Sequence, residues 1–161
     1  MERRAIQELA RKARVYGPEY AEWALRRRRL ERLATLLESI DGPVRLFSTM
    51  ECYSKRERLA LRLERSPLAL AYGDSQFRRD GLRSDSVGDG MAYFNLSMRE
   101  AHALLCDCGY GGMALFRTPM AKLVAQRARR LAAKRCMTEW RHLFADWIEA
   151  AAARLHIGAS A

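Results

Sequence analysis

The stretch that decides the fold covers residues 18–40 and reads PEYAEWALRRRRLERLATLLESI. Its apolar side chains recur at intervals that place them on one face of a helix: Trp23, Leu30, Leu33, Leu37 and Ile40. The pattern predicts a long amphipathic helix with one side against a core. Arg26–Arg29 interrupt this face for one turn. Because four successive helical residues point in four directions, we expect at least one of these arginines to approach the core with its methylene groups on apolar surface.

Start and stop signals divide the rest of the chain into further helices. Prolines stand where a first helical residue is expected: Pro18, Pro67 and Pro119. The pattern S-x-x-E of a capping box occurs at residues 54–57 and 97–100. Asp41-Gly42-Pro43 indicates a helix end. These signals predict helices over about residues 2–14, 18–40, 55–65, 67–72, 98–106, 119–136 and 139–156.

Little of the chain indicates strands. Residues 44–47, 92–95 and 113–116 could each form one, but they are too short for periodicity to decide. Residues 73–90 are rich in Gly, Asp and Ser and predict a long exposed loop. We therefore expect a mainly α fold: a single compact domain of six or seven helices over residues 1–161, to which a small β-hairpin could be added. Its parts are N-terminal helices 1–42, middle helices and loop 43–112, and basic and aromatic C-terminal helices 113–161.

The C-terminal segment 139–156 carries the clearest apolar stripe. The stripe recurs at helical spacing: Trp140, Phe144, Trp147, Ala151 and Leu155. Such a stripe either joins the core or fills a groove on a partner, and the core is the commoner outcome. We expect Trp140, Phe144 and Trp147 to belong to the core.

The chain is strongly basic, with 29 basic and 19 acidic residues and a net charge of +10. A basic excess of this size points to nucleic acid, to an anionic surface or to an acidic protein partner. The excess is local, because residues 97–138 hold eight basic and two acidic residues whereas 139–161 hold two and three. Residues 117–135 contain no acid and seven cations: Arg117, Lys122, Arg127, Arg129, Arg130, Lys134 and Arg135.

This basic segment predicts contact with nucleic acid or a nucleoprotein. On a helix, Arg127, Arg130 and Lys134 share one side, while Lys122 and Arg129 share another. Duplex DNA presents a phosphate charge per ~1.7 Å of axis, so such a helix could contact several phosphates. No aromatic residue lies within 117–139, which favours phosphate contact over base readout. Arg26–Arg29 would form a secondary contact.

Two alternatives to nucleic acid remain open at this point. The basic face could be solvated, or neutralised by carboxylates elsewhere in the chain, such as those of residues 73–90. It could also bind an acidic protein, which would make the chain an interaction module such as an adaptor, inhibitor or assembly factor.

His102, Cys106 and Cys108 form the most suggestive chemical cluster. Zinc prefers tetrahedral nitrogen and sulfur ligands, but only one residue separates these two cysteines, where two to four are usual. A fourth ligand would have to come from a distant residue: Cys52, Cys136 or His142. We therefore expect no metal and no other cofactor. We expect both cysteines of the cluster to be reduced, with Cys106 filling volume in the core.

The same cluster raises the question of a thiol nucleophile. A reactive thiolate needs a neighbouring base and a group that orients it. Cys106 near His102, or Cys136 beside the basic run, could qualify, but neither has an evident orienting group in the sequence. The sequence therefore identifies no reaction, and we expect a binding protein rather than an enzyme.

The sequence also gives an expectation for location. No stretch approaches 18 uncharged apolar residues, and the first residues, MERR, lack the apolar core of a secretory signal. We expect a cytoplasmic protein with reduced cysteines and no membrane partner.

Overall fold

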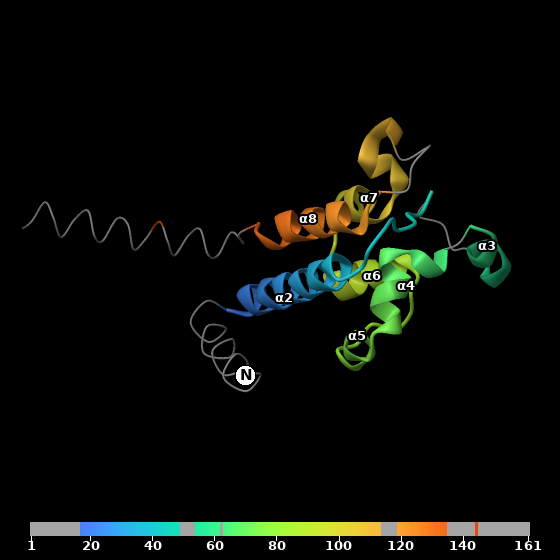
Figure 1. Ribbon diagram of the computed structural model, residues 1–161. Coiled ribbons are helices and arrows are strands. Elements are labelled where there is room, and N and C mark those ends of the chain that lie inside the picture. The colour runs from blue at the N-terminus through green and yellow to red at the C-terminus, as the bar shows by residue number, and fades with distance from the viewer. Residues whose placement is uncertain (1–16, 49–53, 62, 114–118, 135–143, 145–161) are drawn as a thin grey trace, which may run out of the picture. The chain divides into compact units, whose positions relative to one another are not determined.

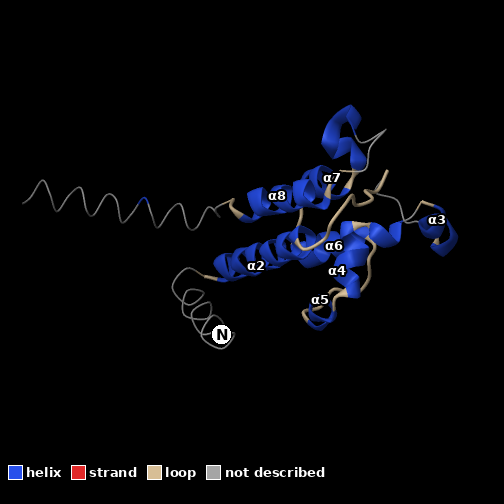
Figure 2. Ribbon diagram, viewed as in Figure 1, coloured by secondary structure: helices blue, strands red, loops and turns tan. Residues whose placement is uncertain are grey.

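The computed structural model describes residues 17–48, 54–61, 63–113, 119–134 and Phe144. The described residues are mainly helical, which confirms the predicted α class, and they contain no strand (Figure 2). The chain divides into two compact units, Met1–Leu25 with Lys134–Ala161, and Arg26–Ala133.

The described α-helices are connected by short loops and 3-10 turns (Figure 1). The 3-10 turns are η1 (Leu63–Arg65) and η2 (Asp107–Met113). The α-helices are α2 (Pro18–Glu38), α3 (Lys55–Ala60), α4 (Pro67–Gly73), α5 (Ser75–Arg79), α6 (Val87–Phe94), α7 (Met98–Leu105) and α8 (Ala121–Ala132). The predicted helix 55–65 is thus split into α3 and η1, and the predicted helices 2–14 and 139–156 lie outside the described residues.

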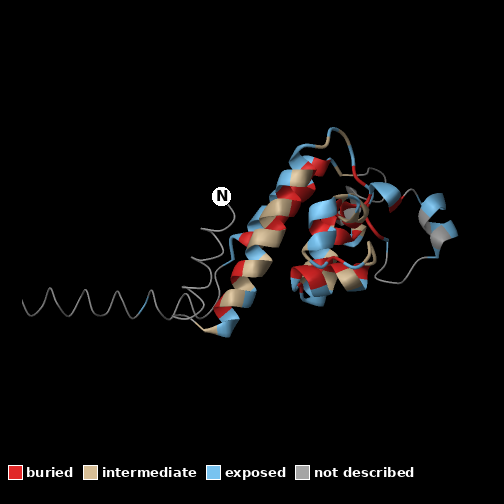
Figure 3. Cartoon of the chain, turned by 90° about the horizontal axis from the view of Figure 1, so that it is seen from below, coloured by how far each residue is buried: buried red, intermediate tan, exposed pale blue. Residues whose placement is uncertain are grey.

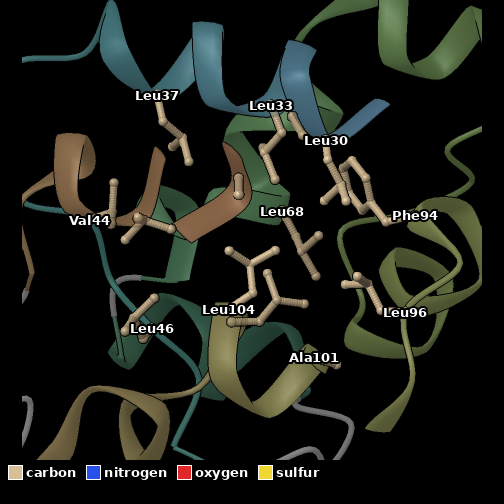
Figure 4. Close-up of a cluster of buried hydrophobic side chains, with 14 of the residues drawn as sticks. Leu30, Leu33, Leu37, Val44, Leu46, Leu68, Phe94, Leu96, Ala101 and Leu104 are labelled. Atoms are coloured by element: carbon tan, nitrogen blue, oxygen red, sulfur yellow. The ribbon is translucent and has the colours of Figure 1, made fainter. Parts of the chain in front are cut away.

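The apolar face of α2 lies in the core of the unit Arg26–Ala133. Leu30, Leu33 and Leu37 are fully buried. Figure 4 shows that their side chains point from α2 toward Leu68 and Phe94. Buried and exposed positions alternate along α2 as an amphipathic helix requires (Figure 3). The predicted long helix and its inward leucines are therefore confirmed.

Local signals place most helix starts correctly. Both capping boxes form, with Ser54 bonded to Glu57 and Ser97 bonded to Glu100. Pro67 begins α4 as predicted. Pro119 does not begin α8: its carbonyl accepts from the N–H of Val44 at 2.9 Å, and the helix starts two residues later. A long-range backbone bond thus decides this boundary against the proline signal.

The predicted long loop over residues 73–90 is wrong. This segment contains α5 and the start of α6, and its small polar residues are helix caps. The side chain of Asp74 accepts from the N–H of Gln76 at 2.7 Å, and that of Ser86 from the N–H of Asp89 at 3.2 Å. Asp and Ser favour caps and turns for the same reason, so composition alone does not separate the two.

In the described part of the chain, the short runs that could have formed strands contain none. Residues 92–94 are the last turn of α6, which ends at Asn95 in a left-handed conformation with φ 48°. Two isolated backbone bridges form at the ends of the run 44–47: Pro43 pairs with Met120 before α8, and Phe47 pairs with Cys106 after α7. The N–H of Phe47 donates to the carbonyl of Leu105 at 3.0 Å. The run 113–116 lies in η2 and then outside the described residues.

One arginine of α2 enters the core side as expected, but it is held by polar contacts. The Arg29 guanidinium donates to the carboxylate of Asp80 at 3.1 Å and to the carbonyl of Tyr93 at 2.6 Å. It also lies 4.0 Å from the Tyr93 ring centroid, and the Tyr93 hydroxyl donates to Asp80 at 2.7 Å. Burial, followed by the bond to Asp80, raises the pKa of Tyr93 above its ordinary value. This network ties α2 to α6 and to the end of α5.

In the other unit, Phe144 corrects a prediction. Its side chain is 62 % exposed, so its assignment to the core is wrong. Helical periodicity shows that apolar residues share a side but does not show what covers it. Trp140 and Trp147 lie outside the described residues. Within this unit the indole N–H of Trp23 donates to the carbonyl of Lys134 at 2.7 Å.

We expect Arg29→Ala to lower the free energy of unfolding by about 1–3 kcal/mol, because it leaves a partly buried carboxylate without its cation. Arg27→Ala is the matched control. It removes an exposed pair with Glu31 on the same helix and should cost less than about 1 kcal/mol. Urea unfolding followed by circular dichroism measures both changes, and equal losses would contradict the assigned role of the network.

Candidate nucleic-acid interface

The basic segment forms α8, and alanine decides how this helix packs. One side of α8 is buried, and it consists almost entirely of alanine: Ala121, Val124, Ala125, Ala128 and Ala132. Small side chains let the helix backbone approach the core closely, and alanine also favours the helical state. The opposite side of α8 is therefore turned to solvent.

The solvent side of α8 presents Lys122, Gln126, Arg129 and Arg130, all exposed. Lys122 and Arg130 have no hydrogen bond or ion pair with any residue in the described part of the chain. Their eight-residue separation corresponds to roughly 12 Å along a helix axis. No acidic residue occurs within α8. We call this set of four side chains the outer face of α8.

Arg129 differs from its two neighbours because it has an acidic partner. Its guanidinium makes two bonds to the carboxylate of Glu38 at the end of α2, at 2.7 and 2.6 Å. The hydrogen bonds from Arg129 hold the pKa of Glu38 below its ordinary value. Both side chains are exposed, so water and salt screen the pair and a phosphate could replace the carboxylate.

Arg127 points away from this face. Its guanidinium donates to the carbonyls of Ala103 at 2.8 Å and of Gly109 at 2.5 Å. It also stacks on Tyr110, with its central carbon 3.6 Å from the ring centroid. One nitrogen of the guanidinium, Nη1, is thus engaged with both α7 and η2.

The remaining cations of the predicted site are Lys134, Arg117 and Arg135. Lys134 is exposed and belongs to the other unit. Arg117 and Arg135 lie outside the described residues. The interface predicted over residues 117–135 stays a prediction, and the structure brings Lys122, Arg129 and Arg130 to one helix side.

The secondary contact predicted at Arg26–Arg29 is largely engaged inside the chain. Arg26 pairs with Glu100 at 2.8 Å, with both side chains mostly buried. Arg27 pairs with Glu31, and Arg29 with Asp80. These ion pairs reduce the number of donors that α2 can offer to a ligand.

Sequence reasoning missed two apolar side chains beside the outer face. Met120 is 53 % exposed and Leu123 is 45 % exposed. Leu123 lies next to Lys122 in sequence, and it falls outside the alanine side of α8. Its position outside the alanine side was the sequence signal that could have identified Leu123 as exposed. A phosphate gains no favourable contact from exposed apolar side chains, so Met120 and Leu123 help to distinguish between a nucleic-acid and a protein partner.

His102, Cys106 and Cys108 occupy different environments. Cys106 is fully buried, as expected, and burial raises the pKa of its thiol to about 12. Cys108 is exposed, and its Sγ lies 3.4 Å from Nδ1 of His102. Among the described residues no group of three or more His, Cys, Asp or Glu side chains could hold a metal ion. Cys52, Cys136 and His142 lie outside this part, so the expectation of no metal stays a prediction.

Comparisons with protein-family models, with curated proteins and with solved structures find no match for this chain. In the described part of the chain no helix is both long enough and apolar enough to cross a bilayer.

We expect Arg127→Gln to lower the free energy of unfolding by about 1–3 kcal/mol, because two carbonyls lose a charged donor and Tyr110 loses its stacking partner. Arg130→Gln, three residues along α8, should change it by less than about 0.5 kcal/mol. Urea titrations of the two variants test the assignment of Arg127 to packing and Arg130 to the surface. A larger loss for Arg130→Gln would reverse it.

Proposed function

We propose that the chain is a small basic binding protein that contacts nucleic acid or a nucleoprotein through phosphates, with the outer face of α8 as the contact surface. The observation that carries the proposal is the pair Lys122 and Arg130, two exposed cations that no described residue neutralises. A surface cation that makes no bond within the chain retains its full donor capacity for an anionic ligand.

The charge of the surrounding unit supports the same conclusion. Residues 26–133 hold 20 basic and 12 acidic residues, so this unit is strongly positive as a whole. Such a field attracts a polyanion at long range, and the exposed cations then provide short-range contacts. No aromatic side chain lies within α8, which makes stacking on unpaired bases at this face unfavourable. Phosphate contact with little sequence preference follows.

Arg129 extends this surface by exchange of partners. In the free protein it is held by Glu38 in two bonds whose geometry also suits a phosphate. Because the pair is exposed, replacing the carboxylate by a phosphate costs little packing. Binding would then use Lys122, Arg129 and Arg130 together.

We expect the double variant Lys122→Gln/Arg130→Gln to weaken binding to a DNA duplex and to reduce the slope of log K against log salt by about 2. The loss should be similar for unrelated duplex sequences, because phosphate contacts carry no base information. Fluorescence anisotropy at several salt concentrations, with duplex DNA, single-stranded DNA and RNA, measures affinity and slope.

The matched control is Arg56→Gln/Arg83→Gln, which removes two exposed arginines from other parts of the same unit. It lowers the net charge equally, so equal losses in both double variants would contradict a site on α8. A variant of opposite effect is Glu38→Gln, which releases Arg129 and should tighten binding a few-fold. Glu64→Gln, which removes an exposed acid on η1, is its charge-matched control.

Met120 and Leu123 favour a second candidate, an interaction module with an acidic protein partner. An amphipathic helix with leucines on one side and glutamates beside them would cover Leu123 and pair with the flanking cations. A nucleic acid would leave both apolar side chains in water.

The second candidate is tested with Leu123→Ser. If the partner is an acidic amphipathic helix, this change should weaken binding of a designed peptide of that kind about threefold to tenfold, because it removes buried apolar area. Binding of duplex DNA should be unchanged. Calorimetric titration of both ligands separates the candidates, and a protein that binds duplex DNA but not the peptide excludes the second.

A cytoplasmic location agrees with either function and stays a prediction.

A further inference from the structure

We propose that Cys108 is a reactive thiol, activated by His102, that forms mixed disulfides with low-molecular-weight disulfides. The proposal does not depend on the outer face of α8. It rests on a thiol and an imidazole that lie within hydrogen-bond distance, with 3.4 Å between Sγ and Nδ1, on a surface that solvent reaches. A thiol beside a base is the arrangement that thiol nucleophiles require.

The turn that carries Cys108 is fixed against α7, so the pair is held in place. Gly109 packs directly on the helix backbone: a Cβ at this position would lie 2.5 Å from the carbonyl oxygen of His102 and 2.7 Å from Cα of Ala103. The Tyr110 hydroxyl donates to the carbonyl of Leu104 at 3.0 Å from a buried position.

Arg127 provides a third attachment, because its guanidinium bonds to carbonyls of both elements, at Ala103 in α7 and at Gly109 in η2. The turn that carries Cys108 is therefore held against α7, which carries His102, by three contacts. The sequence did not reveal this attachment. Fixed placement of a nucleophile and its base lowers the entropic cost of reaching the reactive geometry.

The neighbouring cysteine lies in a contrasting environment, in which we expect no reaction. Cys106 is two residues away but fully buried, with a pKa raised to about 12. A thiol that is both protonated and inaccessible does not attack a disulfide. Cys106 is thus an internal reference within the same short segment.

The reaction is a thiol–disulfide exchange. The Cys108 proton moves to Nδ1 of His102, and the thiolate attacks one sulfur of the incoming disulfide. One S–S bond forms between the protein and that sulfur while the original S–S bond breaks. The departing thiolate takes up a proton from the imidazolium. The numbers of disulfides, thiols and electrons are unchanged, so no further oxidant is needed.

The test follows the reaction of the full-length protein with oxidised glutathione at pH 7, with mass spectrometry of the peptide that contains Cys106 and Cys108. We expect the adduct on Cys108 and none on Cys106. His102→Ala should slow the reaction about fivefold to thirtyfold, because the thiol loses the neighbouring group that accepts its proton. Cys108→Ser should abolish the adduct on this peptide.

Denaturation separates activation from a change in fold. In about 6 M guanidinium chloride the pair of His102 and Cys108 no longer exists, so the wild type and His102→Ala should react at the same rate. Cys106 should then react at about the rate of the other accessible thiols. Circular dichroism confirms that the variants fold. Equal rates for the two folded proteins, or a His102 effect that persists in denaturant, would overturn the proposal.

Discussion

The alanine side of α8 has to lie against the core, and this constraint decides which of the basic residues are available to a partner. Four alanines and Val124 are buried along this side. They meet a core that also contains the leucines of α2. Once that side faces inward, Lys122, Gln126, Arg129 and Arg130 can only face solvent. Charge placement is therefore a consequence of apolar packing. The low volume of alanine is what allows a helix with four cations to approach the core.

The arginines divide into two groups with different physical roles. Arg26, Arg29 and Arg127 are partly buried and bond to carboxylates or carbonyls of other elements. The planar fork of arginine suits such contacts, since it satisfies several acceptors at once and stacks on an aromatic ring. Arg130 and Lys122 remain exposed. A count of basic residues thus overstates the positive charge that a ligand meets, because some of the arginines are engaged in contacts that stabilise the packing of α2, α7 and α8.

Features set by contacts within four or five residues were predictable from the sequence. The two capping boxes join side chain and backbone three residues apart, and the leucine face of α2 follows from helical spacing. Features that depend on distant partners were not. Glu38 and Arg129 lie 91 residues apart, and Arg127 lies 24 residues from Ala103, so no local pattern shows that these arginines have partners. The caps at Asp74 and Ser86 were not predicted, for another reason: Asp and Ser are equally common in turns.

Arg127 connects the two candidate sites through a single packing choice. By turning toward η2 it removes one cation from the side that Arg130 occupies, and the same bonds hold Gly109 against the end of α7. That contact in turn sets the position of Cys108 beside His102. A lysine at position 127 would keep the charge but lacks the planar group that stacks flat on Tyr110. The choice of arginine at this position therefore matters more for the geometry of the thiol than for the electrostatics of the helix surface.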